Sequence, residues 1–89
     1  MPQFPPIVTL YTKPGCHLCE DAKAIIDPLI AEFGATLREI NIDTDSHLTE
    51  QFGYDIPVIF INDRKAAKHR VNPEQFRRQL AEASCTSTK

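Results

Sequence analysis

Residues 7–33 have the sequence IVTLYTKPGCHLCEDAKAIIDPLIAEF and join two patterns of different periodicity. The first six residues are apolar, β-branched or aromatic, as in a buried strand, and the KPG turn ends them. From His17 onward, the apolar residues recur on one helical face. They are Leu18, Ala22, Ile25, Ile26, Leu29, Ile30 and Phe33. The stretch therefore predicts a strand, a tight turn and an amphipathic helix that ends at Gly34.

The rest of the chain continues this alternation. We expect strands over residues 36–43, 57–61 and 65–71, a short helix within residues 44–53, and a last helix from Pro73 to Ala83. Thr44 or Asp45 is expected to cap the short helix, and Asn72 the last one. A helix joins the first two strands, which should therefore be parallel, and the last two strands form a hairpin. The order β-α-β-α-β-β-α predicts an α/β fold: a four-stranded mixed sheet with helices on both faces.

Length and charge narrow the function classes. We expect the 89 residues to form one domain, residues 1–89, with residues 84–89 as a flexible tail. The net charge of −2, with both signs spread along the chain, gives no reason to expect nucleic acid or an anionic membrane as a partner. No apolar run is long enough to span a bilayer, and the first residues, MPQFPP, lack the basic segment of a secretory signal. A monomer in the cytosol is the expectation.

Cys16 and Cys19 lie three residues apart where the turn meets the first helix. Free backbone N–H groups and the positive end of the helix dipole stabilise a thiolate at such a place. Lys13 and His17 add positive charge nearby, and such surroundings lower the pKa of a cysteine from about 8.5 into a range of roughly 3.5–7.5. Cys19, one turn further on, is placed to close a disulfide and to expel a bound partner. The pair therefore predicts a dithiol/disulfide couple.

Two other interpretations of the pair remain open at this stage. In the first, both cysteines are buried small hydrophobes, although the start of a helix after a Pro-Gly turn is an exposed position. A zinc site needs about four ligands, and only one Cys-x-x-Cys is present. The other candidate ligands lack finger-like spacing: His17, His47, His69 and Cys85. We interpret His47 and His69 as solvated surface residues and Cys85 as a free thiol in the tail.

Ile56-Pro57 begins the predicted third strand. A proline at this position is either a simple strand-edge device or a cis proline. In the second case the backbone N–H and C=O of Ile56 would face outward, and an extended substrate could pair with them as an added strand.

Taken together, residues 8–23 (VTLYTKPGCHLCEDAK) and 55–62 (DIPVIFIN) resemble the glutaredoxin-like branch of the thioredoxin superfamily. The resemblance covers residues 7–83 and implies a thioredoxin fold with dithiol oxidoreductase chemistry. It implies that Cys16 is the nucleophile, Cys19 the resolving cysteine and Lys13 the basic residue before the turn. It also implies that Pro57 is a cis proline and that the backbone of Ile56 receives the substrate's cysteine.

Two departures from the family pattern affect the choice of partner. His17-Leu18 stands between the cysteines instead of Pro-Tyr, and a protonated histidine there favours the reduced form. The Gly-Gly pair whose N–H groups hold a carboxylate of glutathione is missing, and DRKAAKHRVNPEQ contains no glycine. Lys68, His69 or Arg70 would have to replace it by charge. This departure argues against glutathione as the thiol donor, and the chain also resembles small redoxins served by a thioredoxin-type reductase.

The sequence hypothesis is a thiol–disulfide oxidoreductase that acts on disulfides of proteins or on mixed disulfides with glutathione. Lys13, His17, Ile56 and Pro57 are the expected substrate-binding residues beside the two cysteines. No metal or organic cofactor is expected beyond an external thiol donor. The rival classes are a binding module that keeps the fold without turnover, and a metal or iron–sulfur carrier.

Overall fold

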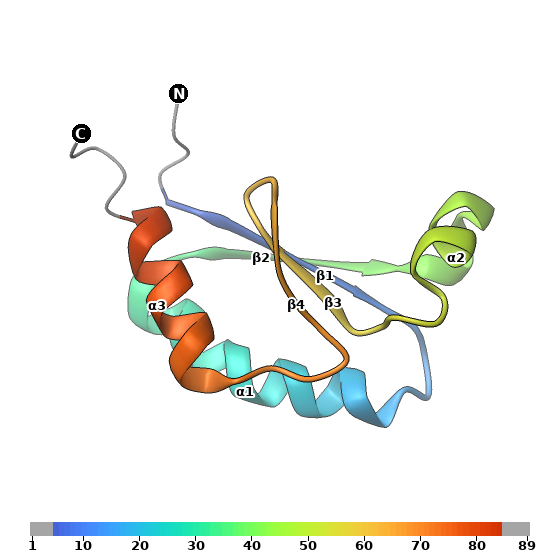
Figure 1. Ribbon diagram of the computed structural model, residues 1–89, viewed down its shortest axis with the longest axis horizontal. Coiled ribbons are helices and arrows are strands. Elements are labelled where there is room, and N and C mark those ends of the chain that lie inside the picture. Colours follow the sequence, from blue (N-terminus) through green and yellow to red (C-terminus); the bar gives the residue numbers. More distant parts are fainter. Residues whose placement is uncertain (1–4, 85–89) are drawn as a thin grey trace.

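Within residues 5–84, which the computed structural model describes, four strands and three α-helices follow in the order that the sequence predicts (Figure 1). A short 3₁₀ helix, η1, lies between the second strand and the second helix. The elements are β1 (Ile7–Thr12), α1 (His17–Phe33), β2 (Thr36–Asn41), η1 (Ile42–Thr44), α2 (Ser46–Phe52), β3 (Val58–Ile61), β4 (Arg64–Lys68) and α3 (Pro73–Ser84).

The strands form one mixed sheet in the order β2-β1-β3-β4. β1 and β2 are parallel, with Val8 opposite Leu37, and α1 is the crossover between them. β3 runs antiparallel to both of its neighbours, β1 and β4. The predicted four-stranded mixed sheet is confirmed.

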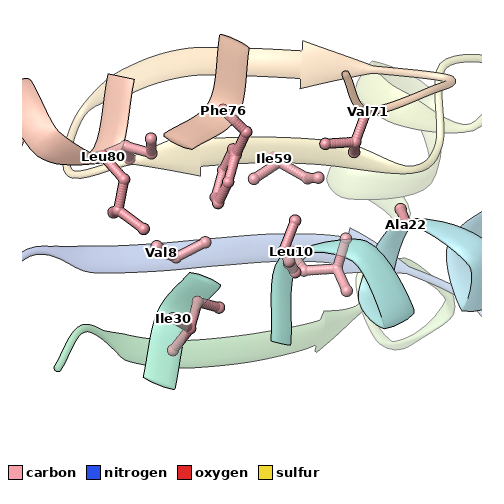
Figure 2. Close-up of a cluster of buried hydrophobic side chains, with 10 residues drawn as sticks. Val8, Leu10, Ala22, Ile30, Ile59, Val71, Phe76 and Leu80 are labelled. Carbon is pink, nitrogen blue, oxygen red and sulfur yellow. The ribbon is translucent and has the colours of Figure 1, made fainter. Parts of the chain in front are cut away.

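Successive side chains of a strand point to opposite faces of the sheet, and the side chains of each face form a separate hydrophobic core. On one face, Val8 and Leu10 of β1 and Ile59 of β3 meet α1 and α3 (Figure 2). On the other face, α2 covers a smaller cluster. Its buried members are Ile42, Phe52 and Val58, and Tyr11, Leu48, Ile56 and Phe60 pack against them. The apolar run of β3 is therefore covered on both faces, as its sequence predicts, and helices lie on both sides of the sheet.

The helix boundaries follow the predicted capping residues. Gly34 ends α1 in the left-handed conformation, with φ of 64°, and its N–H donates to the carbonyls of Ala31 and Ile30. Asp45 caps α2 by accepting from the N–H of His47 at 2.8 Å. Asn72 caps α3 by accepting from the N–H of Gln75 at 3.0 Å.

Three strands differ from the prediction in their bounds. β2 ends at Asn41 because the next residues coil into η1, which buries Ile42 fully and is capped by the Asn41 side chain. β3 begins at Val58 rather than Pro57, since proline has no N–H to donate to the ladder. β4 spans Arg64–Lys68, not 65–71, because His69 takes a positive φ of 67° and turns the chain.

The last helix extends one residue into the predicted tail. Ser84, which the sequence assigns to a tail over residues 84–89, is the last residue of α3. Residues 85–89, and with them Cys85, lie outside the described residues.

Replacement of Phe76 by alanine tests the larger core. Phe76 is 1% exposed between α3 and the sheet, so its loss leaves a cavity under the helix. We expect Phe76→Ala to lower the free energy of unfolding by about 3–5 kcal/mol. Arg78→Ala, an exposed change on the same helix, should stay within about 0.5 kcal/mol of the parent. Urea denaturation measures both, and equal midpoints for the two variants would contradict this packing.

Candidate redox site

The turn between β1 and α1 places Cys16 just outside the helix. β1 ends at Thr12, and Lys13, Pro14 and Gly15 are exposed. Gly15 has φ of 79°, which glycine adopts without steric cost. Cys16 then returns to extended backbone, with φ −93° and ψ 108°, and is the N-cap residue of α1.

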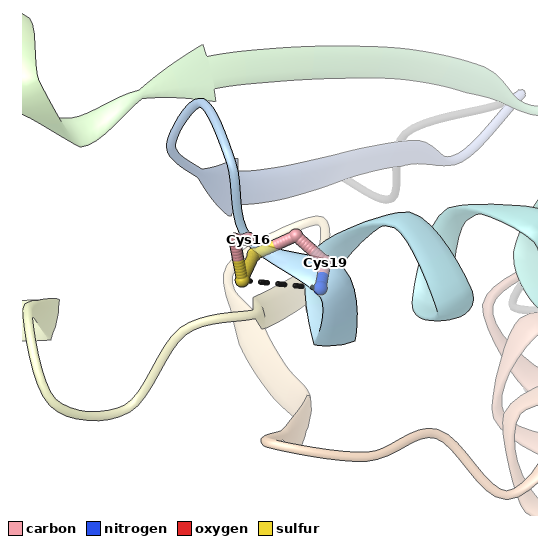
Figure 3. Close-up of a disulfide and its surroundings, with 2 residues drawn as sticks. All are labelled: Cys16 and Cys19. Carbon is pink, nitrogen blue, oxygen red and sulfur yellow. Dashed lines mark hydrogen bonds between the residues drawn. A yellow bond between two sulfur atoms is a disulfide. The ribbon is translucent and has the colours of Figure 1, made fainter.

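The two cysteines form a disulfide across the first turn of α1, with their Cα atoms 5.2 Å apart (Figure 3). Cys16 Sγ also accepts a hydrogen bond from the backbone N–H of Cys19 at 3.2 Å. The sulfur therefore occupies the position of an N-cap acceptor, where a free N–H and the helix dipole both favour negative charge.

The cysteines differ in their access to solvent. Cys16 is half-buried, whereas Cys19 is only 3% exposed and belongs to the interior. An incoming molecule can therefore reach the sulfur of Cys16 more readily than that of Cys19. This arrangement suits a couple in which one thiol meets the partner and the other closes the disulfide from within.

The Ile56-Pro57 segment lies at the same end of the sheet as the cysteine turn. Tyr11 near the end of β1 is the register partner of Val58 at the start of β3, so the residue before β3 adjoins the residues after β1. The Ile56–Pro57 peptide bond is cis, and Pro57 is fully buried.

The expectation that both backbone groups of Ile56 face outward is wrong for the N–H. It donates to the Phe52 carbonyl at 3.1 Å, in the turn that follows α2. No hydrogen bond described for residues 5–84 uses the carbonyl of Ile56. The carbonyl is thus the backbone group that remains for an extended partner.

Lys13 and His17 flank Cys16 on exposed positions, Lys13 in the turn and His17 as the first residue of α1. Neither makes an ion pair within the described part of the chain. Both are positioned to add positive charge near the sulfur when protonated. Their assignment to substrate binding stays a prediction.

His69 makes more hydrogen bonds than its sequence position indicates. Its N–H donates to the Pro57 carbonyl at 2.9 Å and to the Asp55 carbonyl at 3.3 Å. Its Nε2 lies 3.1 Å from the Tyr54 carbonyl. His69 is exposed, as the sequence interpretation has it, but it follows β4 instead of lying within the strand, and it is hydrogen-bonded to the segment before β3. No sequence signal pointed to this role, because a histidine in the left-handed conformation has no short motif.

A groove of about 400 Å³ runs beside the cysteine turn, between the start of α1 and the segment after β4. Leu18, Ala22 and Ile25 line one side, and Arg70 and Val71 line the other. His69 and Asp21 complete it. The groove joins apolar surface with charges of both signs within a few residues of Cys16.

Two large apolar side chains are exposed in the described residues, and both belong to this end of the molecule. Leu18, between the cysteines, is 41% exposed. Tyr54, in the segment that leads to Pro57, is 98% exposed.

Residues 5–84 contain no group of three or more His, Cys, Asp or Glu side chains placed to hold a metal ion. Over the same residues, every helix is too short or too polar to cross a membrane.

The fold and the paired cysteines define a thioredoxin-fold protein with a Cys-x-x-Cys pair at the start of α1. Residues 7–81 match the model of the glutaredoxin-like domain, DUF836. The chain therefore belongs to the glutaredoxin-like family. A curated glutaredoxin-like protein of Dictyostelium discoideum is 35% identical over 75 residues, which cover 78% of this chain and 69% of that protein.

Solved structures agree with the fold. The solution structure of a protein from Nitrosomonas europaea is 28% identical with a TM-score of 0.73, covering 90% of this chain and 96% of that one. A crystal structure from X. campestris has 24% identity and a TM-score of 0.71, over 83% and 95% of the two chains. Oxidised mitochondrial thioredoxin 3 of Saccharomyces cerevisiae shares the fold at 12% identity, with a TM-score of 0.67 over 86% of this chain and 77% of its own.

The difference in exposure predicts which thiol reacts with an alkylating agent. We expect the reduced protein, treated briefly at pH 6, to carry the adduct on Cys16, because Cys16 Sγ sits at the helix N-terminus and Cys19 is buried. Peptide mapping by mass spectrometry locates the adduct. Preferential labelling of Cys19 would reverse the two roles.

Proposed function

We propose that this protein is a dithiol–disulfide oxidoreductase in which Cys16 is the nucleophile and Cys19 the resolving cysteine. The Cys16 thiolate attacks one sulfur of a substrate disulfide, forms a mixed disulfide and releases the first substrate thiolate. The Cys19 thiolate then attacks Cys16 Sγ, forms the Cys16–Cys19 disulfide and releases the second. The substrate gains two electrons and takes up two protons, and the protein loses them.

The observation that carries this proposal is the asymmetry of the pair at the start of α1. Cys16 is the accessible N-cap residue, and Cys19 is buried one turn further on, within disulfide reach. Two equally buried cysteines would have favoured a packing role instead. Membership of the glutaredoxin-like family supports the same chemistry.

An external thiol must return the protein to its reduced form, and no metal or organic cofactor takes part in the proposed cycle. The substrate is a disulfide in a protein or a mixed disulfide with a small thiol. Leu18, which stands between the two cysteines in the sequence and is 41% exposed, offers apolar contact area to either kind of substrate. The protein is proposed to act as a monomer.

Serine variants separate the proposed cycle from a binding module or a metal carrier. In a Cys85→Ser background, which removes the third cysteine of the sequence, Cys16→Ser should abolish disulfide exchange. Cys19→Ser should instead accumulate a mixed disulfide with the substrate, because nothing resolves it. Intact-mass analysis after incubation with a disulfide peptide measures both. A Cys16→Ser protein that still exchanges, or a parent that never does, would refute the mechanism.

The choice of donor depends on the residues after β4, where the family's Gly-Gly pair is missing. The sequence predicts an extended strand there, and this prediction is wrong, since His69 turns the chain. The turn does not free the N–H groups for a ligand. The N–H of His69 donates to the Pro57 carbonyl at 2.9 Å, and that of Arg70 to the Lys68 carbonyl at 2.7 Å. Charge from Lys68 and Arg70 remains, but it is poorly directed and is screened by salt.

Glutathione should therefore bind more weakly here than to a glutaredoxin that has the Gly-Gly loop. Loss of one directed, charge-assisted hydrogen bond, about 1.5–3 kcal/mol, raises Kd by roughly ten- to two-hundred-fold, and loss of a second raises it further. Calorimetric titration of both proteins at low and at moderate salt measures the difference. Tight binding that does not change with salt would show that this segment holds the tripeptide by other contacts.

A further inference from the structure

The segment that leads into Pro57 makes its hydrogen bonds and ion pairs outside its own turn with Lys68 and His69, at the end of β4. Its own turn supplies two hydrogen bonds, since the N–H groups of Asp55 and Ile56 both donate to the Phe52 carbonyl, at 2.8 and 3.1 Å. The remaining hydrogen bonds and ion pairs described for residues 54–57 are made with Lys68, the last residue of β4, and with His69, which follows it.

Among the hydrogen bonds described for residues 5–84, those of His69 reach the residues on both sides of Ile56. Its backbone N–H lies between two carbonyl acceptors, that of Pro57 at 2.9 Å and that of Asp55 at 3.3 Å. Its imidazole reaches the Tyr54 carbonyl at 3.1 Å, and a carbonyl only accepts, so Nε2 is the protonated nitrogen in this bond. The same nitrogen lies 3.6 Å from the carboxylate of Asp55.

The backbone of His69 adopts an unfavourable conformation to make these contacts. Its φ is 67°, and the Arg70 N–H closes onto the Lys68 carbonyl at 2.7 Å around it. A bond from residue i+2 back to residue i around a positive φ is the pattern of the classic γ-turn, which is rare and strained. Non-glycine residues are held in such conformations where the surroundings over-determine them, and such positions cluster at functional sites.

Ile56 lies between Asp55 and Pro57, the two residues whose carbonyls accept from the N–H of His69. Its N–H is used internally, and no hydrogen bond described for residues 5–84 uses its carbonyl. The direction of that carbonyl follows from the peptide planes on either side, and His69 holds acceptors in both flanking residues. His69 also lines the groove that Leu18, the residue between the two cysteines in the sequence, lines on its other side, so the residue that holds this segment lies near the cysteine turn.

We propose that His69 is a positioning residue that aims the Ile56 carbonyl at the backbone N–H of a peptide substrate docked at Cys16. The inference rests on the proposed function and adds a substrate class to it: disulfides carried on a peptide backbone are favoured over disulfides without one. The imidazole acts through residues 54–57 and takes no part in the exchange of sulfur atoms.

Single-turnover oxidation of the reduced protein tests this with two neutral disulfides. One is a blocked cysteine peptide dimer, which offers backbone N–H groups, and the other is 2-hydroxyethyl disulfide, which offers none. His69→Gly keeps the two backbone hydrogen bonds, removes the imidazole and relieves the positive φ. We expect it to slow the reaction with the peptide roughly three- to tenfold, the cost of one misaligned hydrogen bond, and to leave the reaction with 2-hydroxyethyl disulfide unchanged.

His69→Gln should restore most of the peptide rate, because its amide nitrogen reaches about as far as Nε2 and also donates. Asn62→Gly is the matched control, since Asn62 is the other non-glycine residue of positive φ in residues 5–84 and lies in the β3–β4 turn, away from the site. It should leave the peptide rate unchanged.

The inference is overturned by an unchanged peptide rate in His69→Gly, by equal slowing with both disulfides, or by failure of His69→Gln to restore the rate. A parent protein that reacts with neither disulfide would remove the proposed function itself, and the inference with it. A parent that oxidises readily with both while His69→Gly shows no selective loss would leave the proposed function intact and refute the positioning role alone.

Discussion

The parallel pairing of β1 with β2 is the constraint on which the site depends. Parallel neighbours cannot be joined by a hairpin, so the chain must cross over the sheet, and α1 makes that crossing. The start of the helix is thereby fixed beyond the carboxyl end of β1, after a turn of three residues. Ile26, fully buried between helix and sheet, holds the helix in this place. Whatever side chain caps the helix must then stand at this end of the sheet, and here it is Cys16.

The antiparallel β3 brings the second half of the site to the same end. Because β3 runs opposite to β1, its first residue adjoins the last residues of β1, and the Ile56-Pro57 segment arrives beside the cysteine turn. β4 then returns along β3 and delivers His69 to the segment it contacts. The site is thus a product of sheet topology: residues separated by about forty positions meet because the strands that carry them end together.

Those parts of the fold that follow from local pattern could be predicted from the sequence. The stripe from Leu18 to Phe33 and the stop at Gly34 give α1 its observed bounds, and the continuous apolar run PVIFI agrees with the two buried faces of β3. The cysteine pair was identifiable because its position at a helix start has chemical consequences. The end of β4 could not be predicted, because KAAKHRV has no glycine or proline to mark a turn. Hydrogen bonds to the carbonyls of Asp55 and Pro57 determine the backbone conformation of His69 instead. The inward N–H of Ile56 was missed for the same reason: its acceptor, the Phe52 carbonyl, becomes available only when α2 ends at that residue.

The central claim is that Cys16 and Cys19 form one reversible two-electron couple, and a redox titration tests it most directly. The Cys85→Ser protein is equilibrated over a series of dithiol/disulfide buffers, quenched with acid and alkylated, and its free thiols are counted by mass. The account predicts one transition in which both thiols disappear together, with the slope of about 30 mV per tenfold change for two electrons and a midpoint above about −300 mV, within reach of cellular thiol pools. Two separate one-thiol steps, or a pair that stays fully reduced or fully oxidised across the range, would contradict it.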